Sequence, residues 1–255
     1  MTAQPLVRDS RSRAIQIAFF AAVLAAWYAV TAAHRISPLF LPGPVQVAQQ
    51  IGRIAHAPTL ALDIAYTMGT FAIAYTIAVL GGLAAGYIVS TRRFLTRVYE
   101  PLLASLYAIP IVVFFPTFIL FFGTGPNSKI ALGALYAFFP IALNTIAGFT
   151  QVDSRLVAAA RSMGANDALL LRRVLIPAAF PIVATGMRIA FIACFASILA
   201  GEMIASDHGL GHQIAQAGQM MEIAKMFGYV TLVVLAAFAF NFGVSALEAR
   251  RRPTA

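Results

Sequence analysis

The sequence predicts an all-α polytopic membrane protein with about six transmembrane helices. Of its 255 residues, 60% are hydrophobic and only 11% are charged, whereas a soluble domain carries about 25% charged residues. Six apolar runs, each close to or above the roughly 20 residues that cross a bilayer, cover more than half of the chain. Lys and Arg gather between alternate runs, the pattern that sets the orientation of membrane helices.

The apolar runs are bounded by charges or by Pro and Gly, and they cover residues 14–33, 60–89, 100–122, 129–150, 178–203 and 226–247. The first run follows Arg8, Arg11 and Arg13, as a secretory signal would, but it is longer than the apolar region of a signal peptide. We interpret it as an uncleaved first span. One membrane domain is therefore expected over 14–249, between short tails at 1–13 and 250–255.

The basic residues predict the topology. With the first cluster placed in the cytoplasm, 13 of the 18 Lys and Arg residues lie in segments assigned to the cytoplasm, four in outer segments and one, Arg188, within a span. This bias predicts that both termini are cytoplasmic. The net charge of +9 is thereby explained by topology, and no nucleic-acid partner is expected.

Pro and Gly mark special positions in three runs and one outer segment. Pro42-Gly43-Pro44 precedes a short amphipathic pattern, which predicts an outer helix at the membrane interface. Pro110 and Pro116 interrupt the third run and Pro140 the fourth; such breaks either kink a helix or line a pathway. Gly82 and Gly86 allow two helix backbones to approach closely, within the chain or across a dimer.

The inner loop 153–177 has room for folded structure. Asp153 or Ser154 can cap a helix that runs to Met163, and Gly164 stands where a left-handed residue would end it. Asn166 or Asp167 can cap a second helix, which is expected to stop before Pro177. The residues alone predict an elbow of two short helices, which either docks a soluble partner or simply connects two spans.

This elbow resembles the EAA motif of the permease subunits of bacterial ABC importers, whose pattern is EAA-x3-G-x9-I-x-LP. The matching positions are Ala158, Ala159, Ala160, Arg161, Ser162, Met163, Gly164, Val174, Ile176 and Pro177. Ala158 replaces Glu, Val174 replaces Ile and Ile176 replaces Leu. The resemblance implies that the elbow, including Ala165, Asn166 and Asp167, docks in a groove of an ATPase subunit. With Ala158 lacking a carboxylate, Arg161 becomes the candidate for polar contacts there.

Similarity extends over residues 38–252. LPGPVQV (41–47), IPIVVFFPTFILFFGTGPNSKI (109–130), FFPIALNTIAGF (138–149) and GEMIASDHGLGHQI (201–214) resemble the nitrate/sulfonate/taurine permease group. The resemblance implies a homodimer in the bacterial inner membrane, with two ATPase subunits and an extracytoplasmic solute-binding protein. The solute would be nitrate, a sulfonate, taurine or a similar organic anion. The alternative is a neutral heterocycle, a pyrimidine thiamine precursor or a riboflavin-like molecule, because this group also contains such permeases.

The sequence carries no recognisable catalytic or cofactor motif. The chain has no G-x-x-x-x-G-K-[ST] run, so ATP hydrolysis is expected on a separate subunit. His208 and His212 are four residues apart, but glycines separate them, and no metal, cofactor or catalytic site is expected. An ion-coupled secondary transporter is the remote alternative, and it would require more carboxylates within the membrane than Asp63 and Glu202.

Polar residues within the spans are the candidates for a solute pathway, because a charge at mid-membrane costs about 2.5–3.5 kcal/mol on insertion scales. They are Asn144, Arg188 and Glu202, with Pro110 and Pro116 at the broken run. Asn144 has interhelical hydrogen bonding as its alternative role. Arg188 either contacts an anion or pairs near the elbow. Glu202 faces the binding protein or a gate, or holds the loop 207–212.

Overall fold

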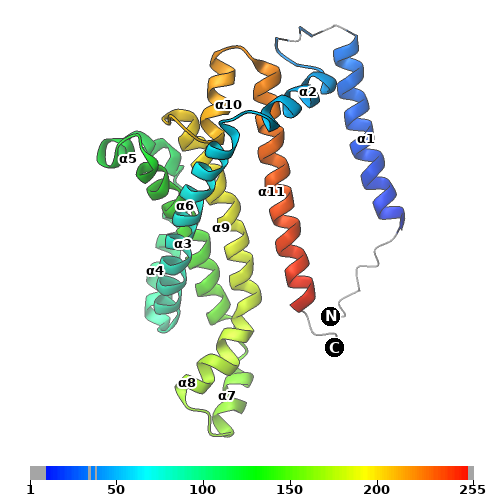
Figure 1. The fold of residues 1–255 in the computed structure, drawn as a ribbon. Coiled ribbons are helices and arrows are strands. Elements are labelled where there is room, and N and C mark those ends of the chain that lie inside the picture. Colours follow the sequence, from blue (N-terminus) through cyan, green and yellow to red (C-terminus); the bar gives the residue numbers. More distant parts are fainter. Residues whose placement is uncertain (1–9, 34–35, 38, 252–255) are drawn as a thin grey trace. The chain divides into compact units, whose positions relative to one another are not determined.

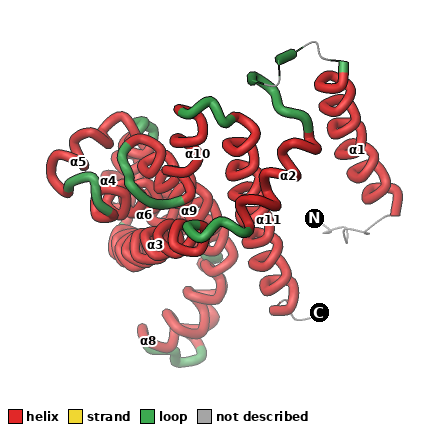
Figure 2. The backbone as a smooth tube through the Cα atoms, turned by 45° about the horizontal axis from the view of Figure 1, so that its top comes forward, coloured by secondary structure: helices red, strands yellow, loops and turns green. Residues whose placement is uncertain are grey.

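The computed structural model describes residues 10–33, 36–37 and 39–251, and in these ranges every regular element is a helix (Figure 2). The chain divides into two compact units. The first unit comprises residues 1–60 and 213–255, and the second comprises 61–212. The predicted tails lie outside the described residues, except for 10–13 and 250–251, which are helical.

The first unit contains α1 (Ser10–Ala32), α2 (Pro44–Ala55) and α11 (Ile223–Arg251). The predicted amphipathic outer helix is α2, which begins with Pro44 in its first turn, where a proline fits best. Val47 and Ile54 on its apolar face are each 3% exposed, and α2 packs on α11. The Trp27 indole donates a 3.1 Å hydrogen bond to the Pro42 carbonyl at the start of this segment.

The second unit is built on three long helices, α3 (Leu60–Ser90), α6 (Pro126–Thr150) and α9 (Ile176–Ile204). They lie side by side (Figure 1), and α6 and α9 form the most extensive contact. Their shared core is rich in small residues, which allow close approach of the backbones. Its fully buried members include Ala74, Ala78, Ala137, Ala190 and Cys194, so Cys194 is a buried apolar residue as expected.

Shorter elements complete the second unit. Between α3 and α6 lie α4 (Arg93–Tyr107), the 3-10 helix η1 (Ile111–Phe114) and α5 (Phe115–Phe122). Between α6 and α9 lie α7 (Ser154–Ser162), α8 (Asp167–Leu170) and the π-helical turn η2 (Leu171–Leu175). The short helix α10 (Leu210–Gln219) begins in the second unit and continues into the first.

In the described part of the chain, four helices are long and apolar enough to cross a membrane, or five if one bent pair counts as a span. The predicted third run, 100–122, corresponds to the bent pair of α4 and η1–α5, which meet at 72° and form either one broken span or a re-entrant loop. Pro110 causes this break, since it offers no backbone N–H and disfavours the helical conformation of Ile109. The predicted span at 226–247 corresponds to α11, whose described apolar part is Ile223–Phe238. Six spans are therefore not confirmed.

Gly82 and Gly86 make their close contact within the chain. A Cβ atom on Gly86 would lie 2.5 Å from Thr145 Cβ and 2.7 Å from the Ala142 carbonyl oxygen of α6. A Cβ on Gly82 would lie 2.8 Å from Ile141 Cβ. Neither contact leaves room for a methyl group, so these glycines set the distance between α3 and α6.

Replacing Gly86 with Ala is expected to destabilise the protein by about 1–3 kcal/mol, because overpacking forces the backbones of α3 and α6 apart. Gly69 is the matched control in the same helix, since a Cβ there meets nothing within 4 Å. Gly69→Ala is expected to be neutral or slightly stabilising through helix propensity. Thermal unfolding in detergent measures both, and equal melting temperatures would contradict the packing argument.

Candidate coupling elbow and solute groove

The elbow begins with α7, and both ends of this helix are capped as the sequence predicts. The Asp153 carboxylate accepts a 2.8 Å hydrogen bond from the Arg155 N–H at the N-terminus. At the other end Gly164 has a φ of +83°, which favours glycine. The N–H groups of Ala165 and Gly164 donate to the carbonyls of Ala160 and Arg161 at 3.0 and 2.9 Å. These two bonds form a Schellman motif, which ends α7 and turns the chain back.

The second arm of the elbow starts at Asn166, whose side chain caps α8 by accepting a 2.8 Å hydrogen bond from the Leu169 N–H. An ion pair joins the two arms, with the Arg161 guanidinium donating to the Asp167 carboxylate. Both side chains are exposed, and exposed pairs contribute at most about 1 kcal/mol. The interior of the elbow is apolar, with Ala160 and Leu170 buried.

A π-helical turn connects the elbow to α9. The prediction that the second elbow helix stops before Pro177 was wrong, because α8, η2 and α9 form one continuous helical stretch, Asp167–Ile204. A proline removes one i→i−4 hydrogen bond and its ring crowds the carbonyl four residues earlier. The wider i→i+5 turn of η2, directly before Pro177, accommodates that crowding without ending the helix.

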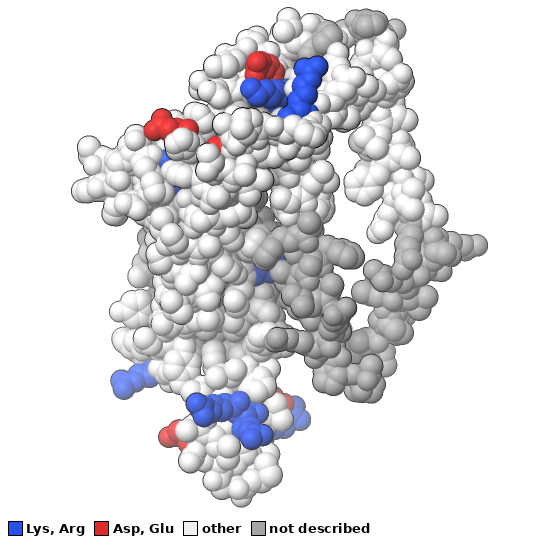
Figure 3. Space-filling view, viewed as in Figure 1, with Lys and Arg blue, Asp and Glu red and all other residues white. Residues whose placement is uncertain are grey.

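The elbow residues that match the motif are mostly on the surface. Exposed are Ala158, Ala159, Arg161, Ser162, Met163, Gly164, Asn166, Asp167, Ile176 and Pro177, while Ala165 and Val174 are half-buried. Met163 at the turn is 82% exposed. The elbow projects beyond the α3–α6–α9 bundle (Figure 1), and basic side chains gather around it (Figure 3). Its surface therefore offers an apolar tip surrounded by charges.

Further along α9, one face of the helix lines a groove. The groove has a volume of about 440 Å³ and is formed by α9, by Val112 of η1 and by Tyr136 of α6. The α9 residues that line it are Ile189, Ile192, Ala193, Ala196, Ser197 and Ala200. We refer to it as the α9 groove. Its lining is aliphatic apart from the Tyr136 phenol and the Ser197 hydroxyl, and that hydroxyl donates to the Cys194 carbonyl at 2.9 Å.

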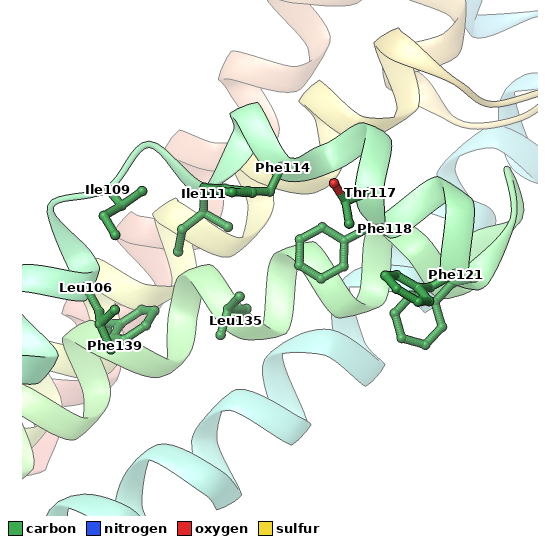
Figure 4. Close-up of a pocket in the computed structure, with 10 residues that line it drawn as sticks. Leu106, Ile109, Ile111, Phe114, Thr117, Phe118, Phe121, Leu135 and Phe139 are labelled. Carbon is green, nitrogen blue, oxygen red and sulfur yellow. The ribbon is translucent and has the colours of Figure 1, made fainter.

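A second groove lies on the other side of η1 and is lined almost entirely by apolar side chains (Figure 4). It has a volume of about 570 Å³ and is bounded by the end of α4, by η1–α5 and by α6. Thr117 is its only polar lining residue, and Phe118 and Phe121 form one of its walls. The broken segment after Pro110 thus separates two grooves, and Phe115 anchors it with a fully buried ring.

The structure assigns local contacts to several of the predicted pathway residues. The Asn144 amide donates a 2.8 Å hydrogen bond to the Pro140 carbonyl of the same helix. A Cβ on Gly186 of α9 would lie 2.4 Å from Asn144 Cβ, so Asn144 also marks the closest approach of α6 and α9. Pro110 and Pro116 flank η1 and are exposed. Arg188 is half-buried in α9, next to groove residue Ile189.

Glu202 lies at the far end of α9 and is 1% exposed. The Thr67 hydroxyl of α3 donates to this carboxylate, 2.9 Å from each oxygen, and the Gly211 N–H donates at 2.9 Å to Oε2. Two neighbouring N–H groups are held in the same way, Leu210 by the Thr67 hydroxyl and Gly209 by the Asp63 carboxylate, both at 2.9 Å. Three consecutive backbone N–H groups are thus bound by side chains of α3 and α9.

We call Asp63, Thr67, Glu202 and the segment 209–211 the loop clamp. Gly209 has a φ of +108°, and a Cβ there would lie 2.5 Å from the Glu202 carboxyl carbon. Only glycine allows the backbone to reach the carboxylate at this position. Of the alternatives for Glu202, the described contacts support the one in which it holds the loop 207–212.

The sequence did not predict a role for two residues at the loop clamp, Lys129 and Thr67. Lys129 is one of the four basic residues that the charge count places in outer segments, but it is fully buried in α6, where its ammonium donates to the carbonyls of Thr124 and Gly125. It also interacts electrostatically with Glu202. A single Lys at the start of an apolar run on the side that is poor in basic residues was the available signal. Thr67 has no such signal, because its role depends on partners far away in the sequence.

The chain is similar to one protein family and to individual proteins that are all described as membrane components of transport systems. The profile of the family described as "binding-protein-dependent transport system inner membrane component" matches residues 77–253. The taurine transport system permease protein TauC of Escherichia coli (strain K12) is 30% identical over 249 residues, which cover 96% of this chain and 90% of that protein. The riboflavin transport system permease protein RibX of Chloroflexus aurantiacus is 32% identical over 227 residues, with 88% and 83% coverage.

Among solved structures, the chain is similar to an inward-facing form of the MetNI methionine ABC transporter. The TM-score is 0.65 at 22% sequence identity, and the match covers 76% of this chain and 97% of the other. At this level of identity the likeness concerns the fold. It places the all-helical architecture of this chain among those of ABC importer permeases.

Proposed function

Since this chain belongs to the family of binding-protein-dependent transport system inner membrane components and is a permease of the nitrate/sulfonate/taurine group of ABC importers, we propose that its solute is a small organic anion of the sulfonate class, such as taurine. The permease domain is taken as residues 14–249, with both termini in the cytoplasm. A solute-binding protein delivers the anion at the outer face.

In the proposed complex two copies of the chain pair, and each elbow docks on one of two ATPase subunits, which hydrolyse ATP. The observation that carries this proposal is the geometry of the elbow, in which a Schellman turn presents an exposed Met163 at its tip. The turn holds Met163 and the exposed motif residues beside it on one protruding surface, which supports a role in docking a partner. The coupling residues are those of the motif, Ala158 to Asp167 with Val174, Ile176 and Pro177.

Movement of the elbow would reach the solute pathway through α9, because η2 joins the two without a break in the helix. The α9 groove is the proposed wall of the pathway. Pro110 and Pro116 lie on either side of η1, which contributes Val112 to this groove. Asn144 fixes α6 against α9, and Arg188 is the basic residue proposed to attract an anion. Glu202 is proposed to act at the outer end through the loop clamp.

Reconstitution tests the proposal. The tagged permease is purified in mild detergent, and mass spectrometry determines whether a nucleotide-binding ATPase co-elutes at one copy per permease. The complex is then placed in liposomes with its binding protein, and uptake of radiolabelled taurine is measured with and without ATP. ATP-dependent uptake is expected. Uptake by the permease alone, driven by a proton or sodium gradient, would overturn the importer assignment.

A neutral heterocycle is the second candidate solute, and the lining of the α9 groove favours it. Most groove residues are aliphatic or small, and an uncharged aromatic ring has no need of a fixed positive charge. The riboflavin permease among the relatives belongs to this class. Competition for uptake by excess riboflavin or a formylaminopyrimidine, but not by taurine, would select the second candidate over the first.

The proposed pathway can be probed with one cysteine. After Cys194→Ala, we expect that Ala196→Cys reacts with a membrane-impermeant thiol reagent and that labelling blocks uptake, because Ala196 is exposed in the α9 groove. Ala190→Cys in the same helix is the control, since Ala190 is fully buried. Labelling of Ala196→Cys that leaves uptake unchanged would remove the groove from the pathway.

A further inference from the structure

A polar groove of about 300 Å³ lies where α3 ends, α4 begins and α6 ends. It is lined by Ser90, Arg93, Thr96, Arg97 and Thr150. All five residues belong to the second unit, and none of them takes part in the elbow, the α9 groove or the loop clamp. We call this site the junction groove.

Two arginines supply the charge of the junction groove. Arg93 and Arg97 are one helical turn apart on α4, and both are exposed. Among the described residues, no acidic side chain forms an ion pair with either of them. Glu100, on the same helix, does not pair with them either. Like charges four residues apart in a helix destabilise it. A bound anion would therefore reduce the electrostatic repulsion between Arg93 and Arg97.

The position of the arginines near the start of α4 increases the electrostatic repulsion that they experience. Arg92 and Arg93 stand at the N-terminal end of α4, the positive end of the helix dipole. The first turn contains no acidic residue, and no side chain caps it. Three guanidinium groups, those of Arg92, Arg93 and Arg97, thus lie at the N-cap or in the first half of α4, and none of them is ion-paired within the described part of the chain.

The hydroxyl groups of the junction groove already have acceptors. Ser90 donates to the Tyr87 carbonyl at 2.7 Å, Thr96 to the Val89 carbonyl at 3.1 Å and Thr150 to the Ile146 carbonyl at 2.8 Å. The side-chain donors left for a ligand are the guanidinium groups. Their planar fork matches the oxygens of a phosphoryl group in a bidentate manner, so the site suits an oxyanion of this kind.

The neighbouring side chains distinguish a lipid from a free phosphate. On α4 the apolar residues Phe94, Val98 and Leu102 are 73%, 46% and 49% exposed. They alternate with the two arginines along the helix, so apolar surface is presented directly beside the charge. A free phosphate makes no use of such surface, whereas the acyl chains of a phospholipid cover it. Basic grooves between membrane helices with this combination bind anionic head groups.

We propose that the junction groove binds the phosphoryl head group of an anionic phospholipid, with Arg93 and Arg97 on the phosphate and Phe94, Val98 and Leu102 against the acyl chains. The inference does not depend on the solute or on the ATPase. It requires only that α4 lies at a membrane surface.

Native mass spectrometry of the detergent-purified protein tests the proposal. Phosphatidylglycerol, phosphatidylcholine and inorganic phosphate are each titrated against the wild-type protein and against Arg93→Gln/Arg97→Gln. We expect that the wild-type protein retains phosphatidylglycerol in preference to phosphatidylcholine. The double variant is expected to bind phosphatidylglycerol about 30-fold more weakly, the effect of losing two basic residues near a lipid surface.

Two further variants complete the experiment. Arg53→Gln removes one exposed charge from α2 and is expected to leave lipid binding unchanged. Arg93→Lys/Arg97→Lys keeps the charges but loses the planar fork, and we expect an intermediate affinity. Equal binding of phosphatidylglycerol by the wild-type protein and the double Gln variant would overturn the proposal. So would binding of inorganic phosphate without preference for the anionic lipid, which would identify a simple anion site.

Discussion

Replacing Gly164 with proline is expected to abolish ATP-driven uptake. Proline fixes φ near −65°, whereas Gly164 has a φ of +83° and donates through its N–H to the Arg161 carbonyl. The substitution therefore removes a hydrogen bond and forces the chain out of the Schellman turn. Because the turn sets the angle between the two arms of the elbow, we expect that the ATPase no longer co-elutes in size-exclusion chromatography and that uptake falls by at least tenfold, equivalent to about 1.4 kcal/mol of coupling.

A graded pair of variants separates coupling from stability. Gly164→Ala places a Cβ in the left-handed region at a cost of about 1–2 kcal/mol. Gly123 at the end of α5 also has a positive φ, +76°, and its Cβ would likewise meet nothing within 4 Å. Its ψ is −179°, a region that is essentially restricted to glycine, so Gly123→Ala carries at least as much local strain at a distance from the elbow. Co-elution and uptake should fall only in the Gly164 variants; if Gly164→Pro still binds the ATPase and transports solute, the elbow is a connector.

The second large effect is expected at Glu202. Glu202→Ala deprives the Thr67 hydroxyl and the Gly211 N–H of their acceptor in a buried site. A buried polar group left unsatisfied costs about 1–3 kcal/mol, so the variant should lose about 2–4 kcal/mol. For a protein of this size that corresponds to a decrease in melting temperature of roughly 5–15 °C. Thermal unfolding in detergent measures the loss.

Matched variants define the role of the carboxylate. Glu202→Gln keeps the volume and one acceptor oxygen, and we expect it to lose about 1–2 kcal/mol. Asp207→Asn makes the same chemical change on an exposed residue of the same loop and is expected to be neutral. Gly209→Ala should destabilise as much as Glu202→Ala, because its Cβ collides with the carboxylate. Full stability of both Glu202 variants would show that the loop clamp is not structural.

The sequence predicted those features that depend on neighbours along the chain. Asp153, Gly164 and Asn166 identified the caps of the elbow, because capping involves residues only a few positions apart. The end of the second elbow helix was misplaced, since the rule that proline stops a helix does not anticipate the π turn before Pro177. Pro110 and Pro116 did indicate an interruption of the third apolar run, but apolar composition does not give its angle, which is 72°.

Local sequence patterns could not predict the loop clamp. Thr67 and Glu202 are 135 positions apart, and only the packing of α3 against α9 brings them together. Glu202 and Asp63 were identified as expensive charges within an apolar chain, but their partner, a loop backbone, carries no side-chain signature. The resemblance included Gly209 and Gly211 without giving the reason for them, which is their contact with Glu202.

The unbroken helix from Asp167 to Ile204 gives the elbow a fixed rotational phase relative to the α9 groove. An inserted or deleted residue in this stretch would rotate one end against the other by about 100° and shift it by about 1.5 Å. Exchanging one aliphatic side chain for another leaves that phase intact. This accounts for how the motif is kept here: Ala158, Val174 and Ile176 differ from it in identity, while the nine-residue interval after Gly164 has its full length.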